Sequence, residues 1–334
     1  MARNKFSFPL STEIGNLPDL KELVIHDAGF TGAIPSEIAN LISLELFSGH
    51  LNFFTGTVPS EIGLMFSIKE VSLGTNALSG QIPDGVFASP TLERLDLSAN
   101  PLGGTIPVTV SDAASLQYLN LAQCSLSGGI PVSFNALPAL TTLDLSLNLL
   151  TGNLPGELGT MIAIQNLYVT GNPLSGPIPS DIASAVTLQE LFLDQCTFTG
   201  ALPSLATLTS LRILRAGSNP FTSGPLPVDL SLIPTLEEIH LNDANFNGGI
   251  PTEYYQLSSL RVLDLSRNGL GGPVPTSPDL VWGNLQELRL ANNQLTGGIS
   301  SDIQNFFSLR KFTDCPGRLK FFPRTFSYPF VLLV

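Results

Sequence analysis

Residues 140–155 read LTTLDLSLNLLTGNLP, and this stretch decides the fold. Leucines alternate with polar residues across its first half, which is the period-2 pattern of a short strand with one buried face. Asn148 follows the strand, where its amide can satisfy backbone groups of neighbouring segments while the chain turns. Gly152 and Pro155 then bend the chain and end the segment. One such unit is too small to bury its own leucines.

The same pattern returns every 24 residues. Eleven glycines keep this spacing: Gly32, Gly56, Gly80, Gly104, Gly128, Gly152, Gly176, Gly200, Gly224, Gly248 and Gly272. Asparagine holds the turn position at Asn52, Asn76, Asn100, Asn148, Asn172, Asn219, Asn268 and Asn293. Each glycine precedes an Ile-Pro, Val-Pro or Leu-Pro pair, and in a final copy after Gly297 the proline is replaced by Ser300. Stacked coils bury their leucines against one another, so the sequence predicts a leucine-rich-repeat solenoid of about 12 coils with a parallel β-sheet along one face.

The unit L-x-x-L-x-L-x-x-N-x-L-x-G-x-I-P, which covers residues 17–314, resembles the plant-specific class of leucine-rich repeat. That class occurs in receptor-like kinase ectodomains, receptor-like proteins and polygalacturonase-inhibiting proteins. The resemblance implies a right-handed superhelix with the parallel sheet on its concave face and a second short sheet beside it. Members usually carry cysteine-paired caps, and this sequence shows neither. We therefore expect a fragment of a longer protein, with residues 1–16 a remnant of an upstream coil, 17–314 the repeat domain and 315–334 a non-repeat tail.

Composition and short motifs narrow the functional class. With 27 acidic against 15 basic residues the formal charge is −12, which argues against a nucleic-acid partner. No apolar run is long enough for a membrane span, and the first residues do not form a signal peptide. The sequence also contains no N-x-[ST] glycosylation site. The resemblance implies an extracellular or cell-surface location, and a cytoplasmic one stays open.

Cysteines and histidines suggest little chemistry. Cys124 and Cys196 occupy the asparagine position three coils apart, so we expect buried, unbridged thiols, and Cys315 lies in the tail. His26 and His50 are 24 residues apart and should stack at about 5 Å. Such a pair could share a metal with Asp27, and a solvated surface pair is the simpler interpretation. We therefore predict no metal.

The positions of the carboxylates and the absence of catalytic motifs argue against an enzyme. The aspartates of the recurring L-D-L-S pattern are Asp96, Asp144 and Asp264, and the closest two lie about 10 Å apart, so we expect a structural role. No nucleophile elbow, zinc-protease motif, phosphate-binding loop or kinase signature occurs. The sequence predicts a non-enzymatic protein without a cofactor.

The outward positions in the middle of the predicted strands point to a binding surface. They are Val24, Ser48, Ser72, Asp96, Asn120, Asp144, Tyr168, Phe192, Arg215, His240, Asp264 and Arg289. Four successive coils thus carry aromatic or basic residues, with polar residues at the next outward positions. Exposed aromatics and arginine ringed by polar groups are typical of binding hot spots. We predict a ligand-binding surface on the concave face formed by Tyr168, Phe192, Asp194, Gln195, Arg215, His240, Asn242 and Asp243.

The predicted function is recognition of a peptide, a glycan or a co-receptor, as in the ectodomain of a plant-type leucine-rich-repeat receptor. Relatives that hold a peptide's free carboxylate often use an R-x-R pair on one strand, whereas Arg212 and Arg215 form only R-x-x-R. The alternative is a soluble inhibitor of a cell-wall hydrolase, similar to the polygalacturonase-inhibiting proteins. A hydrolase using the concave carboxylates, from a third functional class, is the least favoured interpretation.

Overall fold

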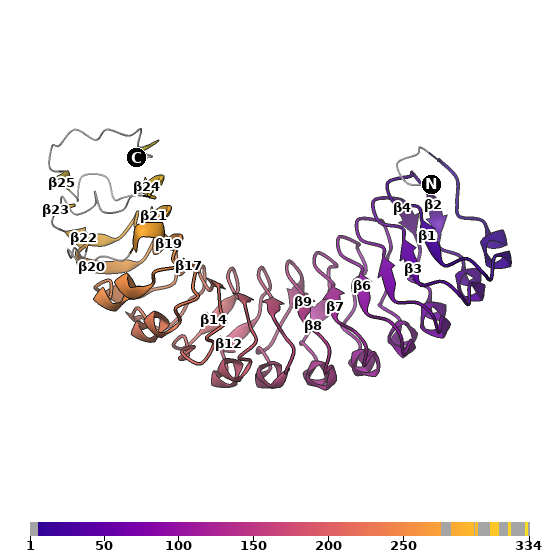
Figure 1. The fold of residues 1–334 in the computed structure, drawn as a ribbon, viewed down its shortest axis with the longest axis horizontal. Coiled ribbons are helices and arrows are strands. Elements are labelled where there is room, and N and C mark those ends of the chain that lie inside the picture. Colours follow the sequence, from indigo (N-terminus) through magenta and orange to yellow (C-terminus); the bar gives the residue numbers. More distant parts are fainter. Residues whose placement is uncertain are drawn as a thin grey trace. The chain divides into compact units, whose positions relative to one another are not determined.

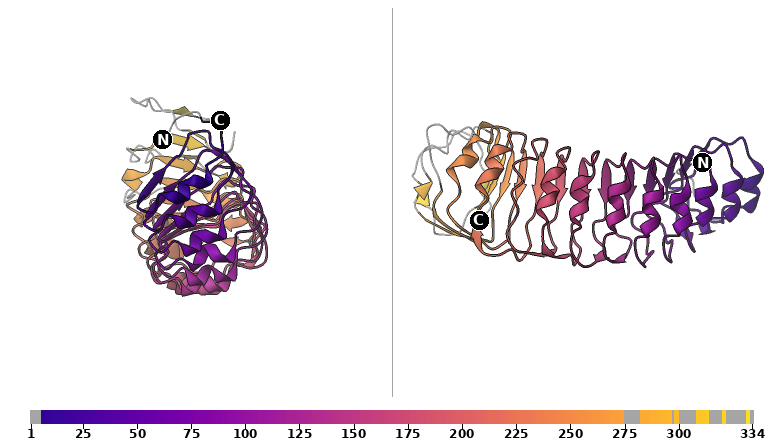
Figure 2. Two further views of the ribbon diagram at one scale, coloured as in Figure 1. Left: turned by 90° about the vertical axis from the view of Figure 1, so that its right-hand side faces the viewer. Right: turned by 90° about the horizontal axis from the view of Figure 1, so that it is seen from below.

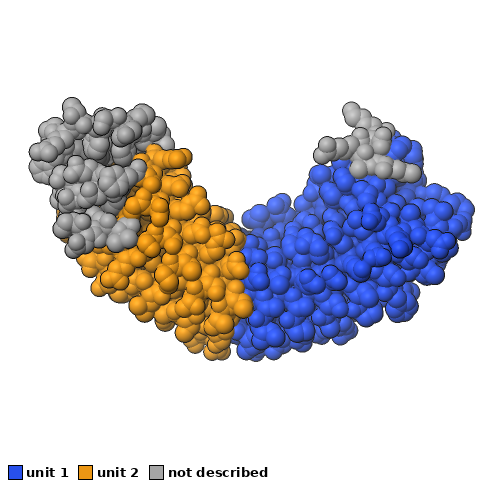
Figure 3. Space-filling model, viewed as in Figure 1, with its two compact units in different colours: residues 1–174 blue, residues 175–334 orange. Residues whose placement is uncertain are grey.

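The computed structural model describes residues 6–274, 282–296, 298–299, 308–313, 320–321 and 331–332. It divides into two compact units, residues 1–174 and 175–334, which Figure 3 colours separately. Pro275, Gly297, Ser300 and Cys315, which the sequence pattern singled out, lie outside the described residues. Each unit is a stack of coils, and in Figure 1 the strands lie along one side of each unit while short 3₁₀ helices lie along the other. The chain is a leucine-rich-repeat solenoid, as predicted.

Parallel strands, one from each coil, form the main sheet of each unit, and the described residues give seven in each. In unit 1 they are β1 (Glu22–Val24), β3 (Leu46–Ser48), β5 (Glu70–Ser72), β6 (Arg94–Asp96), β7 (Tyr118–Asn120), β9 (Thr142–Asp144) and β11 (Asn166–Tyr168). In unit 2 they are β13 (Glu190–Phe192), β15 (Ile213–Arg215), β17 (Glu238–His240), β19 (Val262–Asp264), β21 (Glu287–Arg289), β24 (Lys311–Thr313) and β26 (Val331–Leu332). Every mid-strand residue named above is the last residue of its strand, so the predicted strand positions are confirmed.

Other short strands form a second set of parallel pairings, which is the second sheet that the resemblance implied. In unit 1 they are β2 (Thr31–Ala33) with β4 (Phe53–Thr55), and β8 (Ser127–Gly128) with β10 (Leu149–Leu150). In unit 2 they are β12 (Ser175–Pro177) with β14 (Thr197–Thr199), the run β16 (Gly224–Pro225), β18 (Phe246–Gly248), β20 (Gly269–Pro273) and β22 (Gln294–Thr296), and β23 (Gly298–Ile299) with β25 (Lys320–Phe321).

The 3₁₀ helices follow the Ile-Pro, Val-Pro or Leu-Pro pairs in most coils and stack side by side within each unit (Figure 2). The helices of unit 1 are η1 (Thr12–Asn16), η2 (Ser36–Asn40), η3 (Ser60–Leu64), η4 (Asp84–Ala88), η5 (Val108–Asp112), η6 (Val132–Ala136) and η7 (Gly156–Thr160). Those of unit 2 are η8 (Ser180–Ser184), η9 (Val228–Leu232), η10 (Thr252–Gln256) and η11 (Trp282–Asn284). The proline precedes the first helical residue and adopts extended backbone, as at Pro155 with φ −65° and ψ 132°. It therefore ends the strand-side segment and starts the helix without losing a needed N–H.

Leucines at the repeat positions fill the interior between the strands and the helices. Leu95, Leu119 and Leu143 lie in register on neighbouring strands and are fully buried. Because each coil covers the leucines of the next, the core is continuous within a unit although no coil has a core of its own.

The asparagine column runs alongside this core as a hydrogen-bonded ladder. Asn148 Oδ1 accepts the backbone N–H groups of Cys124 at 3.0 Å and Leu126 at 2.9 Å, both in the preceding coil. Its Nδ2 donates to the carbonyls of Leu121 at 2.8 Å and Leu145 at 3.0 Å. One side chain thus satisfies backbone groups of two coils that would otherwise be buried without partners, which confirms the role expected of this column.

Cysteine at the same position behaves as a small buried side chain. Cys124 and Cys196 are buried thiols, as predicted. Cys124 Sγ donates to the carbonyl of Leu97 at 3.2 Å, and burial raises the pKa of this thiol to about 12. A thiol held protonated in this way is a poor nucleophile and a poor metal ligand.

The predicted domain boundaries stay a prediction. Residues 6–16 contain η1, and Pro9 forms a parallel bridge with Thr31 of the first complete coil. In the tail at 315–334 the described residues form two short strands, β25, which pairs with β23, and β26, which pairs with β24. Across the described part of the chain, no helix has the length and apolar character that a bilayer crossing requires.

Candidate functional site

The strand face of unit 2 carries most of the residues predicted to bind a ligand. Register pairs Phe192 with Arg215 and Arg215 with His240, so these three residues lie side by side at the ends of β13, β15 and β17. The same row continues to Asp264 and Arg289. Tyr168 belongs to unit 1, where it pairs with Asp144, and its place in the same surface stays a prediction.

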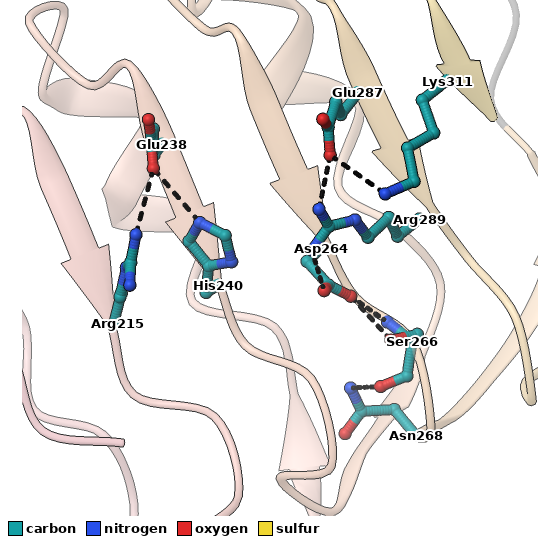
Figure 4. A network of polar contacts seen from close by, with 9 residues as sticks. All are labelled: Arg215, Glu238, His240, Asp264, Ser266, Asn268, Glu287, Arg289 and Lys311. Atoms are coloured by element: carbon teal, nitrogen blue, oxygen red, sulfur yellow. Dashed lines mark hydrogen bonds and ion pairs between the residues drawn. The ribbon is translucent and has the colours of Figure 1, made fainter. Parts of the chain in front are cut away.

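Arg215 is the centre of a cluster that we call the Arg215 cluster, made of Phe192, Arg215, Glu238 and His240. The guanidinium carbon lies 4.5 Å from the centre of the Phe192 ring, within the range of a cation–π contact. Its Nη2 lies 3.6 Å from Glu238 Oε2, and the same oxygen lies 3.3 Å from His240 Nε2 (Figure 4). Glu238 therefore stands between two nitrogen groups from adjacent strands.

The His240 imidazole is held neutral by its surroundings. Burial is the main cause that lowers its pKa, and the positive charge of Arg215 lowers it further. Contact with Glu238 and the charge of Asp264 oppose this shift without reversing it. A neutral ring leaves the Glu238 carboxylate to balance the charge of Arg215.

A second group of charges lies on the neighbouring strands. Arg289 Nη1 contacts Asp264 Oδ2 at 3.1 Å, and Nη2 contacts Glu287 Oε2 at 2.5 Å. Lys311 Nζ lies 3.8 Å from the same Glu287 oxygen (Figure 4). Arg289 is therefore neutralised by two carboxylates at short distance, whereas the contact of Arg215 with Glu238 is longer than a hydrogen bond.

The L-D-L-S aspartates take the structural role expected of them. Asp264 Oδ1 accepts the backbone N–H of Ser266 at 3.1 Å and its hydroxyl at 2.6 Å. Asp96 makes the same two contacts with Ser98, at 2.9 and 2.6 Å. These bonds hold the turn that follows the strand.

Outward residues beyond the strands complete the predicted surface. Gln195 and Asp243 are exposed, and both have left-handed backbone, with φ of 54° and 53°. Asp194 and Asn242 are half-buried one residue earlier. A Cβ built on Gly217 would lie 2.6 Å from Asn242 Oδ1, so only glycine leaves room for that amide to lie over the preceding coil.

Sequence reasoning missed Glu238, which joins Arg215 to His240. The signal was present, because a residue two positions before His240 on a strand must point to the same face. It also missed that Glu237 engages Arg212, with Arg212 Nε 2.7 Å from Glu237 Oε1. Arg212 and Arg215 therefore contact different carboxylates.

The histidine pair of unit 1 stacks as predicted, with ring centres 4.6 Å apart. Within the described ranges no group of three or more His, Cys, Asp or Glu side chains is arranged to hold a metal ion.

Comparison with known proteins finds leucine-rich repeats in several segments of the chain. The family Leucine Rich Repeat matches residues 91–112, 115–137, 139–161, 163–185, 259–279 and 284–306. No curated protein sequence matches the chain.

Three solved structures show the likeness over almost the whole chain. The plant peptide hormone receptor RGFR1 in complex with RGF2 is 28% identical, with a TM-score of 0.77 over 94% of this chain and 54% of that chain. A TDR receptor is 26% identical, with a TM-score of 0.87 over 96% of this chain and 59% of that chain. The Arabidopsis receptor kinase HAESA, in complex with the peptide hormone IDA and the co-receptor SERK1, is 28% identical, with a TM-score of 0.75 over 92% of this chain and 56% of that chain. This chain thus spans a little more than half the length of each. Its repeat and its strand register show a leucine-rich-repeat solenoid, and this solenoid is similar to the plant receptors RGFR1 and HAESA.

Proposed function

We propose that the chain is a non-enzymatic recognition module that binds a peptide on the strand face of unit 2, with the Arg215 cluster as its anchor. The observation that carries this proposal is the stacking of Arg215 on Phe192 beside a carboxylate that it contacts only at 3.6 Å. Stacking orients the guanidinium on an exposed face, so the side chain loses less conformational entropy when a ligand binds.

Arg215 has hydrogen-bonding capacity to offer a ligand. Its side chain keeps 40% of its exposure, and its Nη2 lies 3.6 Å from Glu238 Oε2, which is longer than a hydrogen bond. A carboxylate or carbonyl of a bound peptide would give the guanidinium a charge-assisted hydrogen bond that Glu238 does not supply. Arg289 offers less, because Asp264 and Glu287 already occupy two of its nitrogens.

The similar solved structures support a peptide as the ligand class. RGFR1 and HAESA are each complexed with a peptide hormone, and HAESA also with a co-receptor. This likeness supports a location at the cell surface or outside the cell, and a co-receptor is a second proposed partner. A glycan ligand has no such support.

The test begins with a random peptide library displayed on phage and selected on the purified chain. Selected peptides are then measured by calorimetry against the wild type and the double variant Phe192→Ala/Arg215→Ala. We expect the variant to lose at least about tenfold in affinity, equivalent to ~1.4 kcal/mol. Thermal unfolding followed by circular dichroism establishes that the variant remains folded.

Unit 1 offers a matched control. The Arg94 guanidinium lies 3.9 Å above the Tyr118 ring, a stack of the same kind on the strand face of the other unit. The variant Arg94→Ala/Tyr118→Ala should retain the wild-type affinity. Equal losses in both double variants, or no loss in the Phe192/Arg215 variant, would refute the assignment to the Arg215 cluster.

The hydrolase-inhibitor alternative is tested separately. Inhibition of a polygalacturonase at submicromolar concentration of the chain would favour that function over peptide recognition, particularly if the Phe192→Ala/Arg215→Ala variant still inhibits.

A further inference from the structure

An apolar ridge runs along unit 1 between the 3₁₀ helices and the strands, at the position two residues after each helix. Seven consecutive coils carry an exposed apolar residue there, from Pro18 to Ile162. Its large members Ile42, Phe66 and Ile162 are 65%, 71% and 75% exposed. In unit 2 the corresponding column is interrupted by Thr209 and Ser258. Large apolar residues that recur at one exposed position of neighbouring coils form a contiguous patch, which marks an interaction surface.

Four neighbouring coils form the part of this column that we call the Phe66 ridge, made of Pro18, Ile42, Phe66 and Pro90. Leu64, two residues before Phe66 at the end of η3, is 61% exposed and widens the apolar surface. The Phe66 ridge thus combines an aromatic ring with aliphatic neighbours, a composition typical of the centre of a protein–protein interface.

Backbone carbonyls along the Phe66 ridge already have hydrogen-bond partners. Each accepts a bond from the residue 25 positions later, namely Pro18 from Ser43 N at 3.2 Å, Ile42 from Ser67 Oγ at 2.8 Å, Phe66 from Thr91 Oγ1 at 3.2 Å and Pro90 from Ser115 Oγ at 2.7 Å. Covering the ridge therefore leaves none of these carbonyls without a partner. The same bonds tie each coil to the next and hold the ridge in a fixed shape.

A column of alternating charge accompanies the ridge, three residues after each ridge position. Its members are Lys21, Glu45, Lys69 and Glu93. Lys69 Nζ lies 2.6 Å from Glu45 Oε2, and these two side chains are 54% and 40% exposed. Rotation by 180° about an axis between two neighbouring coils reverses the order of the coils, so each lysine of one copy faces a glutamate of the other. The charge pattern is therefore complementary to itself.

We propose that two copies of the chain pair through the Phe66 ridge, about a two-fold axis that passes between the coils of Ile42 and Phe66. Phe66 of each copy then packs on Ile42 of the other, which brings the largest side chains of the ridge together. The same axis sets Glu45 opposite Lys69 and Lys21 opposite Glu93. Because four coils about 4.8 Å apart make only a short strip, the interface is at the small end of the known range and the Kd should be micromolar.

Sedimentation equilibrium over a micromolar concentration range tests the pairing. We expect a reversible equilibrium between one chain of 35.5 kDa and a dimer of twice that mass. Phe66→Asp should raise the Kd at least about a hundredfold, because a two-fold interface uses the residue twice. Ile162→Asp is the matched control, since Ile162 is equally exposed and lies four coils from Phe66, outside the apposed coils; its Kd should equal that of the wild type. Circular dichroism establishes that both variants are folded.

Charge reversal tests the position of the axis. Glu45→Lys and Lys69→Glu each place like charges opposite one another across the axis, so each variant alone should dimerise at least about tenfold more weakly. An equimolar mixture of the two should form a heterodimer with a Kd near that of the wild type, because a chain with two lysines then faces a chain with two glutamates. The ion pair within each chain stays broken in this mixture, so the recovery can come only from contacts between chains.

A mass of one chain at every concentration, or an equal Kd for Phe66→Asp and the wild type, would overturn the proposal. Failure of the mixed variants to recover would overturn the axis. Association that continues beyond the dimer would indicate a heterologous contact and would also contradict a two-fold pair. None of these outcomes bears on peptide recognition by the Arg215 cluster, which lies in the other unit.

Discussion

Replacing Asn148 by alanine should destabilise unit 1 strongly, because one amide serves two coils. The residue is only 4% exposed, and its side-chain oxygen accepts the N–H groups of Cys124 and Leu126. Alanine would leave both donors buried without an acceptor, at about 1–3 kcal/mol each. After some local relaxation the free energy of unfolding should fall by ~2–4 kcal/mol, near the upper end for a single substitution. The carbonyls of Leu121 and Leu145 lose one contact each, which adds a smaller amount.

Urea unfolding followed by far-ultraviolet circular dichroism measures the loss. Because repeat arrays can unfold in parts, amide hydrogen exchange at Cys124 and Leu126 provides a local readout. Both amides should exchange faster in Asn148→Ala. Asn247→Ala is the matched control, since the Asn247 amide is exposed and donates to Ser223 Oγ at 2.9 Å, and its effect should stay within about 0.5 kcal/mol. Equal stability of the two variants, with unchanged exchange at these amides, would refute the ladder argument.

Three further predictions concern packing and pH. Gly63→Ala should destabilise the fold severely, because the added Cβ would lie 1.7 Å from the Gly85 carbonyl oxygen. In the control Gly249→Ala the added Cβ meets nothing within 4 Å. The Tm of the two variants in thermal unfolding should therefore differ by several degrees. Tyr254→Phe should cost about 1 kcal/mol in urea unfolding by removing the hydroxyl bond to the Pro227 carbonyl at 2.9 Å, and an unchanged midpoint would contradict this. The pKa of His50 in the folded state is below its usual 6.5, so the unfolded state binds more protons. The free energy of unfolding should therefore fall as the pH drops below about 6.5. His50→Gln should reduce this pH dependence in urea unfolding measured at a series of pH values.

The Arg215 cluster shows how much of a binding surface strand periodicity can predict. Phe192, Arg215 and His240 were placed on one face because outward positions recur in every coil, and their register confirms this. Glu238 follows from the same periodicity, because it lies two residues before His240 on β17. Arg215 keeps spare hydrogen-bonding capacity, whereas Arg289 is paired with two carboxylates. This difference could not be predicted, because it depends on side-chain distances across strands.

The sequence by itself determined the fold of this protein. A 24-residue period with buried leucines at fixed offsets leaves one physical solution, in which each coil covers the next, and an asparagine at the turn satisfies the backbone between them. Tertiary structure alone decided the chemistry of the surfaces. Which carboxylate each arginine contacts depends on rotamers, and several rotamers are compatible with the same repeat. The repeat constrains the buried positions because they must pack against identical neighbours, while the outward positions are constrained only by the side chains that happen to lie beside them.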